Sequence, residues 1–396
     1  MSAARAHPHT IWVLTTSRAD FGIYRSVLAA LDAHPRLAPA LVVTGMHVDA
    51  RHGASLEAVR GSGYRIAAEF ACLEPGDAPA DTARSMARAT AGMADALEAV
   101  PESEAPALLL TLGDRFEMLG AALAAVPFRL PVAHIHGGEE TEGAVDNVFR
   151  HMLTKMSQLH FAATERSATR IRQMGEPDAR VVVSGAPALD SLATLSPLPD
   201  AEMRTRFGLD MDRPFHLVTY HPVTLAPETS RAELAALLEV LGETDETLVF
   251  SGTNADTGGL DARAAIDAWA GGRSHVVRVE SFGAPAYYTA MRRAQTLLGN
   301  SSSGILEAAG AGLPVVNIGS RQKGRERSAN VVDCAGTPEA IRAAWEAARA
   351  LRGRDFANVY GRGGAGATIA ATIADFLDST PPARRAVKAF TERPQP

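Results

Sequence analysis

The side chains best suited to exchange protons gather in one stretch, HIHGGEETEGAVDNVFRHMLTK, which runs from position 134 to 155. Its two consecutive glycines permit a sharp turn at the end of an apolar strand, so His136 and Glu139 can both point towards a ligand. His134 shares a strand face with His136, and we expect one of the two to be structural. The spacing of the His and acidic residues matches no usual zinc pattern, so we expect no metal site.

Two further charged candidates follow other apolar runs. Asp114 lies at the end of one run with Arg115 beside it, and desolvation there would raise its pKa enough for acid/base work. The alternative is that Asp114 only caps the next helix. In TTSRADFG, Arg18 is suited to clamp a phosphate, whereas the alternative is an N-cap role for Asp20 with Arg18 solvated.

The sequence GNSSSGILEAAGAGLPVVNIG, positions 299 to 319, leaves a strand, turns through small polar residues and enters a helix. A helix N-terminus has free N–H groups and a partial positive charge, so Ser301 and Ser302 would let a diphosphate approach the backbone closely. We place Glu307 one turn into this helix as a ribose ligand. The alternative is a Ser N-cap with Glu307 in a capping box. Arg321, after the next strand, favours the phosphate interpretation because guanidinium suits phosphate.

Two more polar residues stand where strands are expected to end. His221 follows one strand in VTYHPVT, and Asn254 follows another in SGTNADTGG. Each signal is weak alone. Their common position at strand ends indicates a shared site, because ligands of doubly wound α/β folds bind at the carboxyl ends of the strands.

Short, continuous apolar runs alternate with helix-period segments, which predicts parallel strands and a doubly wound α/β fold. The predicted strands occupy positions 11–16, 40–44, 107–112, 132–136, 159–163 and 180–183, and then 215–220, 247–251, 275–279, 296–299 and 314–318. A proline-containing break near 195–199 separates the two sets. We therefore expect an N-terminal Rossmann-like domain over 1–195 and a C-terminal one over 200–370, facing each other across a cleft.

Composition narrows the possible partners. The chain of 396 residues has 39 Lys and Arg against 45 Asp and Glu, a formal charge of -6, so nucleic acid is not an expected partner. Cys72 and Cys334 are far apart and have no CxxC spacing, which favours buried thiols over a disulfide. The N-terminus lacks the pattern of a signal peptide, and no apolar run is long enough to span a bilayer, so we expect a cytoplasmic protein with no membrane partner.

The motifs SRADFG, GDRFEMLGAAL, HIHGGE, DNVFRHMLTKMSQLHF, SGAPALD, TYHP, SGTNAD and GNSSSGILEA together resemble the hydrolysing UDP-N-acetylglucosamine 2-epimerases, over roughly 11–332. The resemblance implies a glycosyltransferase-B-like pair of domains, with UDP bound mainly by the second. It also implies that a terminal helix within 371–396 crosses back to the first domain. The tail from Pro381 is rich in Pro, Arg and Lys, so we expect it to be frayed. The resemblance assigns nucleotide binding to Arg18, Arg115, His221, Asn254, Ser301, Ser302, Glu307 and Arg321.

The same resemblance assigns catalysis to Asp114, His136 and Asp146, although many relatives have Glu where His136 stands. The pair Asp146 and Arg150, four residues apart, also fits a surface ion pair. The implied reaction converts UDP-N-acetylglucosamine to N-acetylmannosamine and UDP by elimination and hydration, with no cofactor. The histidine-rich stretch is closer to relatives of legionaminic-type pathways.

Several alternatives remain open from the sequence. We rank UDP-N-acetylglucosamine first as substrate and the UDP or GDP form of N,N'-diacetylbacillosamine second. A non-hydrolysing epimerase, a glycosyltransferase on the same fold, or a catalytically silent binding protein would share the nucleotide motifs. We expect a homodimer or homotetramer.

Overall fold

A computed structural model describes residues 8–52, 55–76, 78–140, 146–221, 227–252, 259–280 and 282–393. The chain forms two compact units. Unit 1 comprises Met1–Ser191 together with Gly363–Pro396, and unit 2 comprises Leu192–Arg362. The last part of the chain therefore belongs to the same unit as its beginning.

Unit 1 contains a parallel sheet of seven strands in the order β3-β2-β1-β4-β5-β6-β7. Its strands are β1 (His9–Thr15), β2 (Leu37–Val43), β3 (Arg65–Glu69), β4 (Leu108–Leu112), β5 (Val132–Ile135), β6 (Leu159–Ala162) and β7 (Val181–Val183). The central strands β1, β4 and β5 are almost wholly buried because helices cover both faces of a doubly wound sheet. The strand order changes direction between β1 and β4, which is where such folds bind their ligands.

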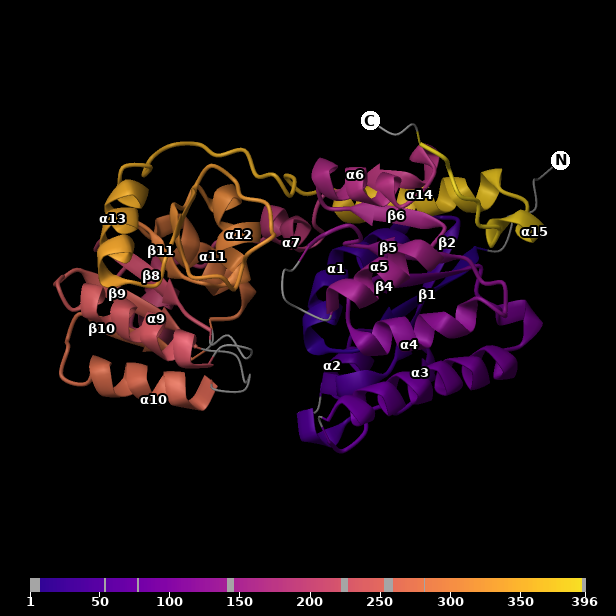
Figure 1. Ribbon diagram of the computed structural model, residues 1–396, viewed down its shortest axis with the longest axis horizontal. Coiled ribbons are helices and arrows are strands. Elements are labelled where there is room, and N and C mark those ends of the chain that lie inside the picture. The colour runs from indigo at the N-terminus through magenta and orange to yellow at the C-terminus, as the bar shows by residue number, and fades with distance from the viewer. Residues whose placement is uncertain are drawn as a thin grey trace. The chain divides into compact units, whose positions relative to one another are not determined.

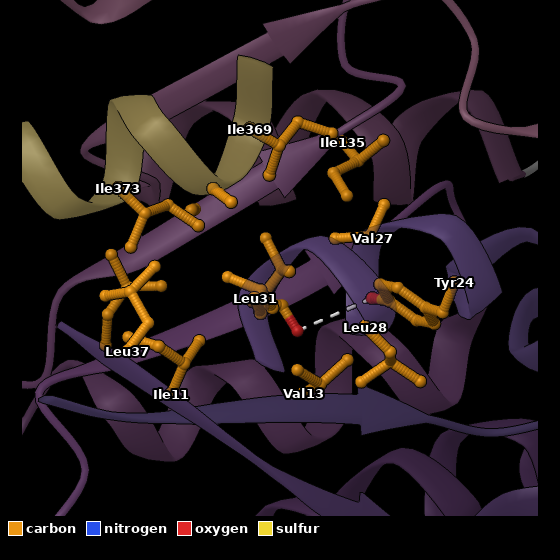
Figure 2. Close-up of a cluster of buried hydrophobic side chains, with 14 of the residues drawn as sticks. Ile11, Val13, Tyr24, Val27, Leu28, Leu31, Leu37, Ile135, Ile369 and Ile373 are labelled. Carbon is orange, nitrogen blue, oxygen red and sulfur yellow. Dashed lines mark hydrogen bonds between the residues drawn. The ribbon is translucent and has the colours of Figure 1, made fainter. Parts of the chain in front are cut away.

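The helices of unit 1 alternate with its strands (Figure 1). They are α1 (Arg18–Ala33), α2 (Ser55–Arg60), α3 (Pro79–Ala99), α4 (Phe116–Ala125), α5 (Asp146–Met156), α6 (Glu165–Gln173), α7 (Ala188–Thr194), α14 (Ala365–Ser379) and α15 (Pro382–Arg385). One apolar cluster joins α1 and α14 to one face of the sheet, and a second joins α3 and α4 to the other. Figure 2 shows the first cluster, in which Ile369 and Ile373 of α14 lie near Val27 and Leu31 of α1.

Polar contacts also attach the C-terminal segment to unit 1. The carboxylate of Asp190 accepts hydrogen bonds from the backbone N–H groups of Ala365 at 2.9 Å and Gly366 at 2.6 Å, at the start of α14. Further along, the N–H of Thr391 donates to the carbonyl of Gly175 at 2.8 Å. The tail that the sequence suggests is frayed is therefore held against the unit as far as Arg393, whose guanidinium pairs with Asp178.

Unit 2 contains a parallel sheet of six strands in the order β10-β9-β8-β11-β12-β13. Its strands are β8 (Phe215–Thr219), β9 (Thr247–Ser251), β10 (Val276–Val279), β11 (Leu297–Gly299), β12 (Val315–Ile318) and β13 (Val331–Cys334). Its helices are α8 (Asp200–Phe207), α9 (Pro227–Leu241), α10 (Gly259–Ala270), α11 (Ala284–Arg293), α12 (Ser302–Leu306) and α13 (Pro338–Arg349). Separate apolar clusters cover its two faces.

These two parallel sheets confirm the predicted doubly wound α/β fold. Every predicted strand is present, and β3 and β13 are two strands that were not predicted. Their continuous apolar runs, over 66–68 and 331–332, are shorter than those of the central strands. In the part of the chain that the structure describes, no helix is long and apolar enough to cross a membrane.

Candidate active site

The turn after β1 carries a buried acidic side chain with a structural role, Asp20, and an exposed cationic side chain, Arg18. The carboxylate of Asp20 is buried and accepts hydrogen bonds from the Thr16 backbone N–H at 3.0 Å and the Thr16 hydroxyl at 2.7 Å. Ser17, rather than Asp20, is the N-cap of α1. Arg18 is exposed and makes no hydrogen bond or ion pair with any residue that the structure describes, so its guanidinium is available for a ligand.

The turn after β4 carries Asp114 and Arg115. Asp114 does not cap the next helix, because Arg115 occupies the N-cap position of α4. The Asp114 carboxylate instead forms an ion pair with the guanidinium of Arg150, whose side chain is only 5% exposed. Arg115 is half-buried and donates to the fully buried carboxylate of Glu117 at 2.5 Å. Both side chains at this strand end are therefore fixed by a charged partner.

The turn after β5 holds a histidine–carboxylate pair. His136 adopts a left-handed backbone conformation, with φ of 64°, that is uncommon for any residue except glycine. Its Nδ1 lies 2.5 Å from Oε1 of Glu139, and both side chains are largely buried. Because an ionised carboxylate only accepts hydrogen bonds, Nδ1 carries the proton and the lone pair of the neutral ring is on Nε2. A ring in this tautomer can take a proton at Nε2.

The glycines that follow His136 are required by close packing. A Cβ atom on Gly138 would lie 2.2 Å from the carbonyl oxygen of Ser167, and the φ of Gly138 is 73°. A Cβ atom on Gly137 would lie 2.8 Å from the hydroxyl of Thr154. No L side chain fits at these distances, so the two glycines allow the chain to turn directly over α5 and α6.

His134 is the structural member of the histidine pair. It is completely buried, and its Nε2 donates to the carbonyl of Gly113 at 2.8 Å. Its Nδ1 accepts from the hydroxyl of Thr154 at 3.1 Å. Burial lowers the pKa of His134 to about 3, so the ring is neutral at physiological pH and connects β5 to the turn after β4.

Arg150 links the turns after β4 and β5. In addition to its ion pair with Asp114, it donates to the carbonyl of Glu139 at 2.8 Å. The ion pair of Arg150 is therefore with Asp114, whose side chain is 28% exposed, rather than with Asp146 as the spacing allows. Asp146 is the first residue of α5 and is partly exposed at the surface. The pKa of its carboxyl is raised, mainly by desolvation and to a lesser degree by the negative charge of Asp114.

In unit 2, a buried asparagine joins the ends of β8 and β11. Asn300 accepts a hydrogen bond from the backbone N–H of His221 at 2.7 Å and donates to the carbonyl of His221 at 2.8 Å. The preceding Gly299 has φ of 136°, and a Cβ atom there would lie 2.0 Å from the carbonyl oxygen of Thr219. Only glycine permits this approach, which holds His221 next to the serine turn.

The serine turn begins α12. Ser301 is its N-cap, and its hydroxyl lies 3.0 Å from that of Ser303, which is 2.9 Å from the hydroxyl of Tyr287. Ser302 is the first residue of the helix, where N–H groups have no partner within the helix. Glu307 is not one turn into a long helix, as the sequence suggests, because α12 ends at Leu306 and Glu307 is its C-cap. Burial raises the pKa of the Glu307 carboxyl to about 7.

Arg321 follows β12 and contacts the main chain of the same asparagine. Its Nη1 donates to the carbonyl of Asn300 at 3.1 Å, and Nε2 of Gln322 donates to that carbonyl at 2.9 Å. His221, Ser301 and Arg321 therefore follow the three adjacent strands β8, β11 and β12. A cation, an imidazole and free N–H groups at the carboxyl ends of neighbouring strands are suited to bind a phosphate group.

The structure brings the candidates together as two groups, one in each unit. Asn254 lies outside the described residues. Asn300 and Gln322 were not among the site residues predicted from the sequence, although Asn300 directly follows a predicted strand. Arg150 was predicted only as the partner of Asp146 in a surface ion pair. Among the described residues, no three His, Cys, Asp or Glu side chains are close enough to hold a metal ion.

The two doubly wound units define the two-domain α/β architecture of glycosyltransferase-B-like enzymes. A solved structure of UDP-GlcNAc 2-epimerase from Neisseria meningitidis bound to UDP-GlcNAc is similar, with a TM-score of 0.74 and 18% identity, covering 92% of this chain and 99% of that one. At this identity the likeness establishes the fold.

The chain belongs to the UDP-N-acetylglucosamine 2-epimerase family, whose model matches residues 29–374. It is 35% identical to a UDP-N,N'-diacetylbacillosamine 2-epimerase (hydrolyzing) of Legionella pneumophila, covering 88% of this chain and 91% of the relative. It is 30% identical to a GDP/UDP-N,N'-diacetylbacillosamine 2-epimerase (hydrolyzing) of Campylobacter jejuni, covering 82% and 83%. The family suspected from the motifs is thus confirmed, and membership assigns UDP-sugar 2-epimerase activity at the level of the family.

Proposed function

We propose that the chain is a hydrolysing 2-epimerase that acts on a UDP-linked 2-acetamido sugar. The enzyme removes the C-2 proton and expels UDP, so the C-2–H and C-1–O bonds break and a 2-acetamidoglucal forms. Water then adds a hydroxyl to C-1 and a proton to C-2 on the face that inverts this carbon. The products are UDP and the free sugar with inverted C-2.

The observation that carries the proposal is the cluster at the ends of β4 and β5. It combines the His136–Glu139 pair, whose Nε2 is a base, with Asp114 and with Asp146, an acid of raised pKa. Elimination and hydration need one group to take a proton and another to return one, and groups of different acidity suit these two steps. Arg150 holds the cluster together from within the fold.

The polar residues that follow β8, β11 and β12 in unit 2 are suited to bind the leaving group. Arg321 and the start of α12 offer a positive charge and N–H donors to a departing diphosphate, and stabilising that charge promotes cleavage of the C-1–O bond. We assign the carboxylate of Glu307 to the ribose, from whose hydroxyls it would accept hydrogen bonds.

For the sugar, the relatives change the order expected from the sequence. Both curated relatives described above carry the name of N,N'-diacetylbacillosamine, and the more similar of them carries the UDP form alone. We therefore place UDP-N,N'-diacetylbacillosamine first and UDP-N-acetylglucosamine second. A pocket that hydrogen-bonds a sugar hydroxyl strongly rejects an analogue without it, so kcat/KM should differ clearly between the two.

The test is to incubate the purified protein separately with UDP-N,N'-diacetylbacillosamine, its GDP form and UDP-N-acetylglucosamine in D2O. NMR then identifies the free nucleotide, the C-2 configuration of the sugar and deuterium at C-2. We expect free UDP and a deuterated, inverted sugar. An inverted sugar still attached to UDP would indicate the non-hydrolysing reaction. Turnover that needs an added acceptor would indicate a glycosyltransferase, and no release from any substrate would contradict the proposal.

We also infer that the enzyme is a homo-oligomer. Large apolar side chains are exposed on α4, on the loop after α4 and on α5. The helices α4 and α5 contact each other in unit 1. These side chains are Leu123, Val126, Phe128, Val148 and Met152. Light scattering on a size-exclusion column should give the mass of a dimer or tetramer, and Val148→Asp with Met152→Asp should shift it towards the monomer. A monomeric wild-type protein would contradict this inference.

A further inference from the structure

Unit 1 has a cavity at the end of its sheet opposite the candidate catalytic residues. The cavity has a volume of about 360 Å³ and is lined by Gln158 before β6, by Arg180 before β7 and by the tail that follows α14. The catalytic candidates follow the carboxyl ends of β1, β4 and β5, whereas this cavity adjoins the amino ends of β6 and β7. In a parallel sheet the carboxyl ends and the amino ends of the strands lie on opposite sides of the sheet, so the cavity is separate from the candidate active site.

The charged groups around this cavity are mostly cationic. Four cations and one carboxylate line it: Arg180, Arg384, Arg385, Lys388 and Glu176. The carboxylate is already neutralised, because Glu176 forms ion pairs with Lys155 at 3.0 Å and with Lys388, and it also contacts His160. The three arginines have no carboxylate partner among the residues that the structure describes. The wall of the cavity therefore has a net positive charge.

The two inner arginines are held in place by neutral groups. Arg180 donates to the hydroxyl of Thr380 at 3.3 Å and stacks over the ring of Phe376 at 4.4 Å. Arg385 donates to the carbonyls of Thr380 at 3.0 Å and Leu377 at 2.6 Å, at the end of α14. Partial burial lowers the pKa of both guanidinium groups, because it disfavours their charged forms. An anion in the cavity would offset this cost.

The exposed Arg384 completes the set from the outer side. Its guanidinium makes no hydrogen bond or ion pair within the described part of the chain, so ordering this side chain around a ligand breaks no side-chain contact. Guanidinium groups present paired N–H donors that match the oxygens of phosphate, and hydroxyls such as that of Thr380 can donate as well. Pro177 and Val387 add apolar surface, which suits a ligand with a small organic part.

We propose that this cavity is a second, non-catalytic binding site for a small phosphate-bearing metabolite, which bridges Arg180 of the body to Arg384 and Arg385 of the C-terminal tail. Binding would hold the tail against unit 1, because the ligand contacts both parts. This site does not depend on the proposed reaction. The chemistry that recognises the ligand is that of a phosphate dianion, and the apolar wall selects among its esters.

Limited digestion with trypsin tests the proposal without measuring turnover. Arg384, Arg385 and Lys388 are themselves trypsin sites, so mass spectrometry can follow cleavage in the tail separately from cleavage elsewhere. The whole protein is digested in sodium chloride, acetate, inorganic phosphate or pyrophosphate at equal ionic strength. At an anion concentration ten times its dissociation constant, mass action should slow tail cleavage about tenfold. We expect this for phosphate and pyrophosphate but not for chloride or acetate.

Two matched variants locate the effect. Arg384→Gln removes one cation from the cavity and should weaken phosphate binding about 10- to 150-fold, so protection at Arg385 and Lys388 is lost. Arg166→Gln removes an equally exposed cation from α6, away from the cavity lining, and should keep the protection. Equal rates in chloride and phosphate, equal protection by acetate, or full protection in Arg384→Gln would each overturn the proposal. Protection only at sites outside the tail would overturn it too.

Discussion

Replacing Glu139 by glutamine tests whether this carboxylate sets the tautomer of His136. The carboxylate accepts the Nδ1 proton at 2.5 Å and leaves Nε2 as the base. A glutamine side chain can present its NH2 group to Nδ1, which would move the ring proton to Nε2 and remove the base. The substitution also removes the negative charge that stabilises the imidazolium formed when Nε2 takes a proton.

The size of the effect follows from the kind of contact that is lost. A hydrogen bond to a charged group contributes about 1.5–3 kcal/mol. Because about 1.4 kcal/mol corresponds to a factor of ten in rate, kcat should fall about 10- to 150-fold. The contact acts on the proton transfer, so we expect KM to change little.

Steady-state release of free UDP measures kcat and KM for Glu139→Gln. The matched control is Glu140→Gln at the next position, whose carboxylate contacts Asn147 and His151 instead of His136. In parallel, ¹⁵N NMR of histidine-labelled protein, with His136→Asn to assign the signal, should show the Nδ1–H tautomer in the wild type only. If kcat of Glu139→Gln stayed within about twofold of that of Glu140→Gln, or if the wild-type ring carried its proton on Nε2, the reasoning would be refuted.

Four other substitutions test separate parts of the structure. Asp114→Asn should abolish turnover and leave UDP affinity nearly unchanged, whereas Arg321→Ala should weaken UDP binding by about 1.5–3 kcal/mol in calorimetry; substantial turnover by Asp114→Asn would contradict its assignment. Gly299→Ala should lower the free energy of unfolding by about 2–4 kcal/mol in urea titrations, because a Cβ atom would lie 2.0 Å from the Thr219 carbonyl; Gly22→Ala, where a Cβ atom meets nothing within 4 Å, is the control. The pKa of Glu307, about 7 in the folded protein, lies above its unfolded value of 4.5, so ionisation destabilises the fold as pH rises from 4.5 to 7. Glu307→Gln should therefore raise Tm relative to wild type at pH 8 but not at pH 4, and an equal change at both values would be inconsistent with a buried, titrating carboxyl.

The central strands of both sheets could be predicted from the sequence because they are buried on both faces and are therefore continuously apolar. The strands β3 and β13 were not predicted, because their continuous apolar runs are only three and two residues long. The motifs were equally informative about the family, because eight short segments in a fixed order rarely occur together by chance.

The partners of individual side chains were decided only by the tertiary structure. The sequence places Arg150 four residues after Asp146, but the fold brings it to Asp114, which is 36 residues away in the chain. Nothing in the local sequence distinguishes His134 from His136. Packing against Gly113 and Thr154 makes the first structural, and a left-handed turn directs the second towards Glu139.

The C-terminal segment shows the same division. Its many Pro, Arg and Lys residues suggested a frayed end, because such residues bury little apolar surface by themselves. In the folded chain, these cations instead find partners: Arg385 donates to carbonyl groups at the end of α14, and Lys388 contacts the carbonyl of Ser157 and the buried Glu176 on distant elements of unit 1. Composition and local pattern thus determined most strands, the fold class and the family. The pairing of charged side chains depended instead on the tertiary structure, because their partners lie far away in the sequence.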